Sequence, residues 1–175
     1  MRLRELRMED APLMLEWMHD DFVVHDLATN FSEKNIEDCN NFIQYAISQT
    51  SDISKCKDIH MAVVDDNDEY MGTVSLKNIN RQRKDAEFAI TVRRSAMGRG
   101  YSKYAMSEVI EIGFKAPELG LTNIYWCVDK KNLRARRFYD KQNYKTMEAN
   151  DNMMENYKKI GGGTELIWYS VQRQP

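Results

Sequence analysis

The sequence predicts an α/β fold with a mixed sheet, and two features of the chain point to it. Strand-like and helix-like segments alternate in the order β-α-α-β-β-β-α-β-α-β-β. Residues 124–128 also form a nearly continuous apolar run, which is typical of a strand covered on both faces. The 175 residues contain no internal repeat and no Pro/Gly-rich linker, so we expect a single domain over residues 1–175.

Composition and charge narrow the class of protein. With 42% hydrophobic and 30% charged residues, the chain has the make-up of an ordinary globular protein. Its formal net charge of -2 argues against a general attraction to nucleic acid or to an anionic membrane. No apolar run approaches the roughly 20 residues that span a bilayer. The three cysteines and three histidines lack metal-ligand spacing, and the cysteines suit a reducing compartment, so we expect a cytoplasmic protein without a metal site.

The N-terminal part of the chain predicts one strand and two helices. Residues 3–6 have the pattern of a short strand. Asp10 and Pro12 then begin a helix, because proline is tolerated at a first turn and acidic residues favour it. Residues 20–31 lack periodicity and are expected to form a loop. Ser32 is the expected N-cap of a second helix.

Three strands are predicted next. Residues 59–64 and 70–76 flank a polar cluster of Asp and Asn, which forms a turn. Residues 85–92 alternate, which places Phe88 on one face of the strand and Glu87 on the other.

The C-terminal part predicts two more helices and the closing strands. One helix begins after Gly100, and another spans residues 133–142. Residues 144–148 and 166–171 would be the last strands. Between them, residues 151–163 are polar and end in three glycines, so we expect a mobile loop.

Two glycines, Gly98 and Gly100, lie between a predicted strand and a predicted helix. Glycine lets the backbone approach a ligand without obstruction from a Cβ atom. The helix N-terminus that follows presents unpaired N–H groups and a partial positive charge, which suits a pyrophosphate. The nearby cationic side chains are Arg93, Arg94, Arg99 and Lys103.

Two familiar nucleotide fingerprints are excluded by spacing. The chain has no match to the Walker P-loop, and a dinucleotide fingerprint would need a small residue at the position of Lys103. Taken alone, the glycine pair is also compatible with a simple turn surrounded by solvated arginines.

Residues 123–144 form the second informative segment. A predicted strand leads to Asn132, which can cap the next helix or hydrogen-bond a ligand amide. That helix carries Phe138 and Tyr139 toward the core. Asn143 follows the helix, and asparagine tolerates the left-handed conformation that ends many helices.

In this order, the two segments resemble the acetyl-CoA signature of the GNAT N-acetyltransferases. The N-terminal residues 3–11, followed by Leu15-Glu16-Trp17, are similar to the branch that includes ribosomal-protein N-terminal, spermidine and sugar-nucleotide amine acetyltransferases. The resemblance covers residues 3–170. It implies the GNAT fold, with a mixed, mostly antiparallel central sheet flanked by helices, and transfer of an acetyl group from acetyl-CoA to a primary amine.

The resemblance also implies roles for the matched residues. Backbone amides of the glycine loop would hold the CoA pyrophosphate, and the end of the strand at residues 85–92 would pair with the pantetheine arm. Asn132 would contact CoA, and Tyr139 would donate a proton to the leaving thiolate. The implied cofactor-binding residues are Ile90, Thr91, Val92, Met97, Gly98, Arg99, Gly100, Tyr101 and Asn132.

The chain departs from the family pattern at two positions. Ser95 stands where the family usually has Gln or Arg, and we expect Arg93 or Arg94 to compensate. Asn143 replaces the usual glycine, which is harmless because asparagine adopts the same backbone conformation.

Glu87 is the candidate base for removing the amine proton, directly or through a water, because the branch often places an acid there. Its alternative is a solvent-facing carboxylate or an ion pair. Tyr139 could also serve packing alone, since a phenol can both pack and donate. Cys127 is expected to be an inert core residue, and Trp17 to belong to the core or a pocket wall. The acidic cluster at residues 19–26 would suit a cationic amine, although an acidic surface loop is the commoner explanation.

The sequence therefore predicts an acetyl-CoA-dependent N-acetyltransferase with Tyr139 and Glu87 as catalytic residues. A protein N-terminus, a polyamine and an amino sugar all remain open as the acceptor. The alternatives are a catalytically silent GNAT-like module that binds CoA or a partner as a sensor, and a bare structural domain. The partners expected are acetyl-CoA and an amine, without nucleic acid or membrane, and the exposed C-terminal strands would allow a homodimer.

Overall fold

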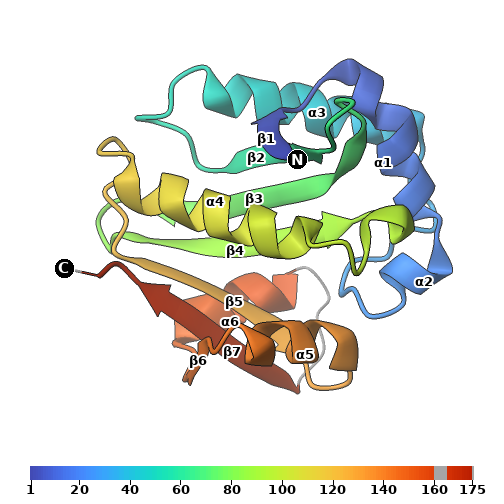
Figure 1. Cartoon of the computed structure of the whole chain (residues 1–175). Helices are drawn as coiled ribbons and strands as arrows, with labels where there is room; N and C mark the ends of the chain where they lie inside the picture. Colours follow the sequence, from blue (N-terminus) through green and yellow to red (C-terminus); the bar gives the residue numbers. More distant parts are fainter. Residues whose placement is uncertain (160–164, 175) are drawn as a thin grey trace.

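The computed structural model describes residues 1–159 and 165–174 and contains one seven-stranded sheet in the order β1-β2-β3-β4-β5-β7-β6 (Figure 1). The strands are β1 (Arg2–Glu5), β2 (Ile59–Val64), β3 (Tyr70–Asn80), β4 (Asp85–Val92), β5 (Asn123–Asp129), β6 (Lys145–Met147) and β7 (Leu166–Gln172). The α-helices are α1 (Ala11–Met18), α2 (Asp21–Val24), α3 (Ile36–Thr50), α4 (Tyr101–Lys115), α5 (Leu133–Lys141) and α6 (Asp151–Lys159). Short 3-10 turns, η1 (Met8–Asp10) and η2 (Arg94–Ala96), precede α1 and the glycine loop.

The sheet is mixed and mostly antiparallel, which confirms the predicted fold class. Only β4 and β5 pair in parallel among the described strands, and they do so over three residue pairs, Asp85–Asn123, Ala86–Ile124 and Glu87–Tyr125. Beyond Glu87, β4 remains paired with β3, whereas β5 pairs along its whole length with β7. The two halves of the sheet therefore diverge after Glu87, as Figure 1 shows.

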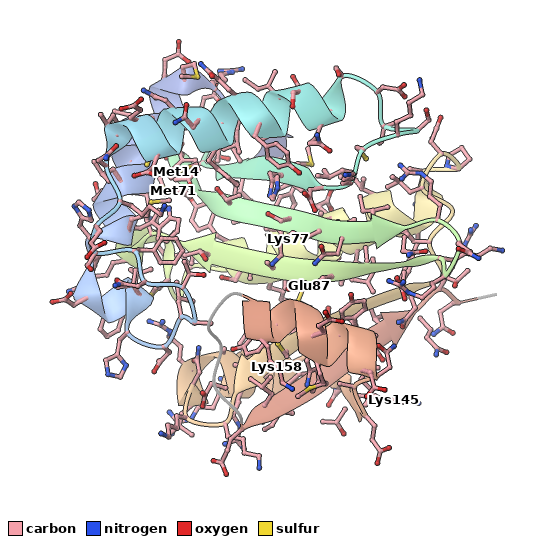
Figure 2. All side chains as sticks on the ribbon, turned by 180° about the vertical axis from the view of Figure 1, so that it is seen from behind. Met14, Met71, Lys77, Glu87, Lys145 and Lys158 are labelled. Atoms are coloured by element: carbon pink, nitrogen blue, oxygen red, sulfur yellow. The ribbon has the colours of Figure 1, made fainter. Side chains whose placement is uncertain are left out.

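Helices cover both faces of the sheet. Helices α4 and α5 lie on the face seen in Figure 1, and α3 and α6 lie on the opposite face, seen in Figure 2. The α4 face buries an apolar core that includes Val109 and Ile124. The α1 and α3 side buries a second core that includes Met14 and Ile43. Apolar burial on both faces explains why the central strands have few polar positions.

The predicted strands at residues 59–64 and 85–92 and the helices after Gly100 and at residues 133–142 are confirmed, within a residue or two at their ends. The predicted N-cap at Ser32 is wrong. Asn35 caps α3 instead, since its side chain accepts from the Glu37 and Asp38 amides and the Asp38 carboxylate accepts from the Asn35 amide. Ser32 bonds to Asn30 in the preceding turn.

The predicted loop at residues 151–163 is also wrong over its first part, because α6 occupies Asp151–Lys159. Met153 is buried there against Tyr125 and Trp168, and the Asn150 side chain accepts from the Met153 amide at the helix start. The segment is polar on average, so its helical conformation depends on packing against the sheet rather than on its composition. The three glycines of that prediction lie outside the described residues. The loop expected at residues 20–31 likewise contains the short helix α2.

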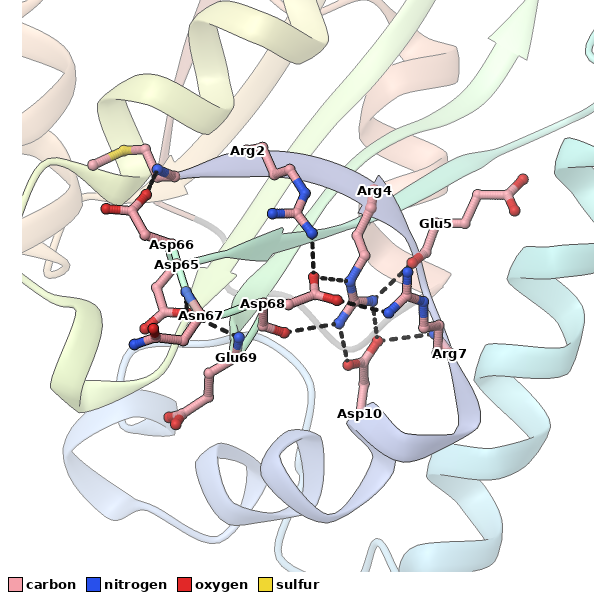
Figure 3. A network of polar contacts seen from close by, with 11 residues as sticks. Arg2, Arg4, Glu5, Arg7, Asp10, Asp65, Asp66, Asn67, Asp68 and Glu69 are labelled. Carbon is pink, nitrogen blue, oxygen red and sulfur yellow. Dashed lines mark hydrogen bonds and ion pairs between the residues drawn. The ribbon is translucent and has the colours of Figure 1, made fainter.

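An arginine cluster ties the first strand to its neighbours. The Arg4 guanidinium donates to both Asp10 carboxylate oxygens at 2.8 Å and, through Nε, to Asp68 at 2.8 Å (Figure 3). Asp10 also accepts from the Arg7 amide at 2.8 Å, and Arg7 and Arg2 donate to Asp68. Hydrogen bonds to Asp10 raise the pKa of Arg4, which stays charged. The cluster joins β1, the start of α1 and the turn between β2 and β3.

Replacing Asp10 by alanine should destabilise the protein, because Arg4, with an 11% exposed side chain, would lose its bidentate partner. We expect the free energy of unfolding to fall by about 3 kcal/mol, measured by urea denaturation. Asp66→Ala is the matched control, since Asp66 pairs with the terminal amine through a side chain that is 93% exposed, and its unfolding midpoint should not change. Equal losses in the two variants would contradict this account.

Candidate functional site

A cleft of about 520 Å³ opens where β4 and β5 diverge. Its walls come from β4, β5, the glycine loop, α5 and the α2 region, with Tyr157 of α6 at one side. In the part of the chain that the structure describes, no β4 residue after Glu87 pairs with β5. Peptide groups on that edge of β4 therefore face the cleft with bonding capacity available to a ligand.

The glycine loop forms one end of the cleft. Gly98 and Gly100 have φ angles of 73° and 89°, in the left-handed region, and a Cβ at either position would meet no atom within 4 Å. Gly100 is the N-cap of α4 and offers no side chain to its first turn, so those N–H groups lack an intrahelical acceptor. Ser102 and Lys103, from the same turn, also line the cleft. The space above the glycines, the unpaired amides and the lysine suit an anionic group such as a diphosphate.

The two arginines expected to compensate for Ser95 point elsewhere. Arg93 is buried and forms ion pairs with Glu16 at 3.0 Å and Glu69 at 2.6 Å. Arg94 forms an ion pair with Asp20, the N-cap of α2. Both guanidinium groups therefore hold the start of the loop, and neither arginine lines the cleft.

Asn132 and Tyr139 hold the opposite wall. Asn132 is buried, and its side chain caps α5 by accepting from the Ala135 amide at 2.9 Å. Tyr139 is 7% exposed and lies against the rings of Trp126 and Tyr169, with centroid distances of 5.3 Å and 5.2 Å. Burial raises the pKa of the Tyr139 hydroxyl, so it keeps its proton at neutral pH and is available as a donor.

Glu87 lies on the other face of β4, between α3 and α6, as Figure 2 shows together with Lys77. One of its carboxylate oxygens bonds to the Lys77 ammonium at 2.9 Å and the other to the Asn78 side chain at 2.8 Å. Asn78 has a φ of 52° at an irregularity in β3 that turns its side chain to this position. Glu87 is therefore in an ion pair, and it also lines the cleft.

A second cavity of about 310 Å³ adjoins the cleft. It lies between α1, α3 and the sheet, and it shares Phe31, Lys77 and the β4 residues 89–91 with the cleft. Trp17 lines it and donates an indole hydrogen bond to the Tyr70 hydroxyl at 3.1 Å, so Trp17 is both a core residue and a cavity wall. The two spaces meet at β4.

Most residues predicted for the site come together in the cleft. The predicted residues that line it are Glu87, Ile90, Thr91, Val92, Met97, Gly98, Gly100, Asn132 and Tyr139. The side chain of Tyr101, the first residue of α4, is buried in the core, and the prediction for this residue concerned its backbone amide. The Arg99 side chain lies over the Tyr101 ring, 5.5 Å from its centroid. Cys127 lines the cleft, where burial raises the pKa of its thiol to about 12, so it is protonated and poorly nucleophilic.

The cleft residues that the sequence analysis did not single out include Arg134, Tyr157 and Phe31. Arg134 donates to the Phe22 and Val23 carbonyls and so links α5 to α2, a contact between residues far apart in the chain that leaves no local signal. Tyr157 reaches the cleft from α6, and burial raises its pKa to about 12. Its helical spacing from Met153 was a weak sign of a buried face. Phe31 was predicted to lie in a loop and was given no function, although it lines both the cleft and the second cavity.

Neither a metal cluster nor a membrane span is found among the described residues. No group of three or more His, Cys, Asp and Glu side chains in residues 1–159 and 165–174 could hold a metal ion. Within the same ranges, no helix is long and apolar enough to cross a bilayer.

The model of one protein family, described as the acetyltransferase (GNAT) domain, matches residues 1–145. The chain belongs to the GNAT acetyltransferase family. The glycine loop and most of the β4–β5 cleft lie within the matched part of this GNAT chain. A search of curated protein sequences finds no significant match.

Solved structures share the fold of this GNAT acetyltransferase at low sequence identity. A spermidine N-acetyltransferase from Vibrio cholerae, in complex with CoA and spermine, is 16% identical with a TM-score of 0.76, covering 98% of this chain and 94% of that one. A putative ribosomal-protein-serine acetyltransferase from Vibrio cholerae is 16% identical with a TM-score of 0.73, covering 98% and 92%. The microcin C7 self-immunity acetyltransferase MccE, in complex with acetyl-CoA and AMP, is 13% identical with a TM-score of 0.73, covering 98% and 91%.

Proposed function

We propose that this GNAT acetyltransferase transfers the acetyl group of acetyl-CoA to a primary amine by direct attack within a ternary complex. The observation that carries the proposal is the cleft at the β4–β5 divergence, which combines an unpaired strand edge, a glycine loop and a protonated phenol. None of these three features is by itself specific to an acetyltransferase. Their arrangement around one space matches the needs of a long cosubstrate with a diphosphate at one end and a thioester at the other.

The residues fit acetyl-CoA along the length of the cleft. Amides of the glycine loop, residues 97–101, would hold the pyrophosphate, and Lys103 would add a cation at the first turn of α4. The β4 residues Ile90, Thr91 and Val92 would offer the pantetheine arm backbone groups that β5 does not use. Asn132 would contact the cosubstrate from the start of α5.

Acetyl-CoA supplies an activated acyl group when it is bound. The acceptor nitrogen forms the new C–N bond to the acetyl carbon while the C–S bond breaks, and the electron pair of that bond goes to sulfur. Tyr139 gives its proton to the sulfur and regains one from solvent. Glu87 takes the proton released by the amine, and because Lys77 and Asn78 occupy both of its oxygens, we propose that a water carries that proton.

The cleft alone does not distinguish a protein N-terminus, a polyamine and an amino sugar as the acceptor. The competing proposal is a silent module that binds CoA or a partner as a sensor. A buried phenol on the wall of the cleft supports the enzyme, because a sensor needs no proton donor at that place.

Calorimetric titration with acetyl-CoA, followed by thiol-release assays on peptides, polyamines, amino sugars and simple monoamines, tests the proposal. Saturable binding with thiol release that depends on an added amine is the expected result. Binding without release on any amine would favour the sensor, and absence of binding would overturn the cosubstrate assignment.

Tyr139→Phe should lower kcat by about a hundredfold while the Kd for acetyl-CoA stays the same, since only the proton donor is lost. The matched control is Tyr144→Phe. Tyr144 packs edge-on against the same Trp126 ring at 4.9 Å and is not among the residues that line the cleft. Equal activity of Tyr139→Phe and wild type would remove Tyr139 from the mechanism.

Gly100→Ala should raise the Kd for acetyl-CoA by about tenfold or more, because the added methyl group would lie where we propose that the pyrophosphate binds. Gly120→Ala is the control for backbone strain. Gly120 has a φ of 60° and lies in the turn before β5, away from the cleft. Both variants should lose about 1 kcal/mol of stability. Loss of CoA affinity in both, or in neither, would contradict the phosphate assignment.

A further inference from the structure

The second cavity has mainly apolar walls. Five large apolar side chains line it from α1, α3 and the segment between α2 and α3: Met14, Trp17, Met18, Phe31 and Phe42. Trp17 and Phe31 meet edge to face, with centroids 5.1 Å apart and an interplanar angle of 70°. Rings and thioethers of this kind form favourable contacts with another aromatic ring.

Three polar residues of the lining, His60, Thr73 and Ser75, are uncharged. His60 is buried, and its Nδ1 lies 2.7 Å from the Ser75 hydroxyl. Burial lowers the pKa of His60 to about 4, so its imidazole is neutral at physiological pH. The Phe42 ring packs edge-on against His60 at 4.8 Å. The Ser75 and Thr73 hydroxyls also line the cavity and offer hydrogen bonds without charge.

The charged residues around the cavity are balanced in pairs. Asp38 is the one carboxylate among the described lining residues, and it already pairs with Lys34 at 3.2 Å and caps α3. Lys77 pairs with Glu87 at the boundary with the cleft. Glu87 at this boundary and Asp38 in the cavity each already have a cationic partner, so the second cavity offers no unpaired carboxylate to a further amino group of a polyamine.

We propose that the acceptor is a small arylalkylamine, with one amino group at the β4 residues 89–91 near Glu87 and an aromatic ring in the second cavity. The proposal rests on the function proposed above. A volume of about 310 Å³ is at the small end of the range for small-molecule sites. The aromatic walls favour a ring, and the charge balance disfavours acceptors with several positive charges.

Steady-state kinetics with 2-phenylethylamine, spermidine, glucosamine, methylamine and a short unblocked peptide test the proposal on the wild-type protein. We expect kcat/KM for 2-phenylethylamine to exceed each of the others by about tenfold or more. A higher value for spermidine, glucosamine or the peptide would overturn the arylalkylamine assignment and leave the acetyltransferase proposal intact. Thiol release with none of the amines would overturn both.

A variant of the second cavity tests whether the aromatic ring of the amine binds there. Phe42→Ala, which changes only the second cavity, should raise the KM for 2-phenylethylamine by about tenfold and leave kcat/KM for methylamine and the Kd for acetyl-CoA unchanged. Ile47→Ala is the control on the same helix, because Ile47 is 41% exposed and lines neither space. An unchanged KM in a folded Phe42→Ala variant, or equal losses for 2-phenylethylamine and methylamine, would place the ring elsewhere. If Phe42→Ala does not fold, the order of the wild-type kcat/KM values for the five amines still tests the amine class.

Discussion

The short parallel pairing of β4 with β5 is the constraint on which the site depends. Three residue pairs hold the strands together, and then each strand follows a different partner, β4 with β3 and β5 with β7. Phe88 and Trp126, the first residues beyond the pairing, meet edge to face at 5.6 Å and fill the base of the opening. The outer part of β4 therefore has an edge that β5 does not pair, and the cleft opens along it.

The cationic residues around the glycine loop have structural roles that composition alone would not suggest. Arg93 reaches Glu16 on α1 and Glu69 before β3, and it also donates to the Tyr70 carbonyl. Arg134 bonds to two carbonyl oxygens of α2. These contacts fix the start of the loop and the α2 segment against α5. Lys103 is the basic side chain of the loop region that lines the cleft. Anion binding would therefore depend more on backbone amides than on guanidinium groups.

The face of the sheet between α3 and α6 carries the proposed acceptor site. Lys77 and Glu87 neutralise each other there, and His60 is uncharged because burial disfavours its protonated form. The apolar walls above them come from α1 and α3. The cofactor site and the acceptor site that we propose thus differ in what they are built from. One is built from backbone groups of a strand and a loop, and the other from side chains whose identity can vary without changing the fold.

The sequence by itself determined the fold class, most helix and strand positions, and a set of cleft residues that includes Gly98, Gly100 and Tyr139. Those features depend on local rules: strand alternation set Glu87 and Phe88 on opposite faces, and the glycine pair fixed where α4 begins. The tertiary structure alone decided the partners of Arg93, the extent of the β4–β5 pairing, the helical state of residues 151–159 and the second cavity. Each of these joins segments far apart in the chain, and α6 in particular is stabilised by burying Met153 on the sheet. Local periodicity cannot encode such contacts, because their free energy arises only when distant surfaces pack together.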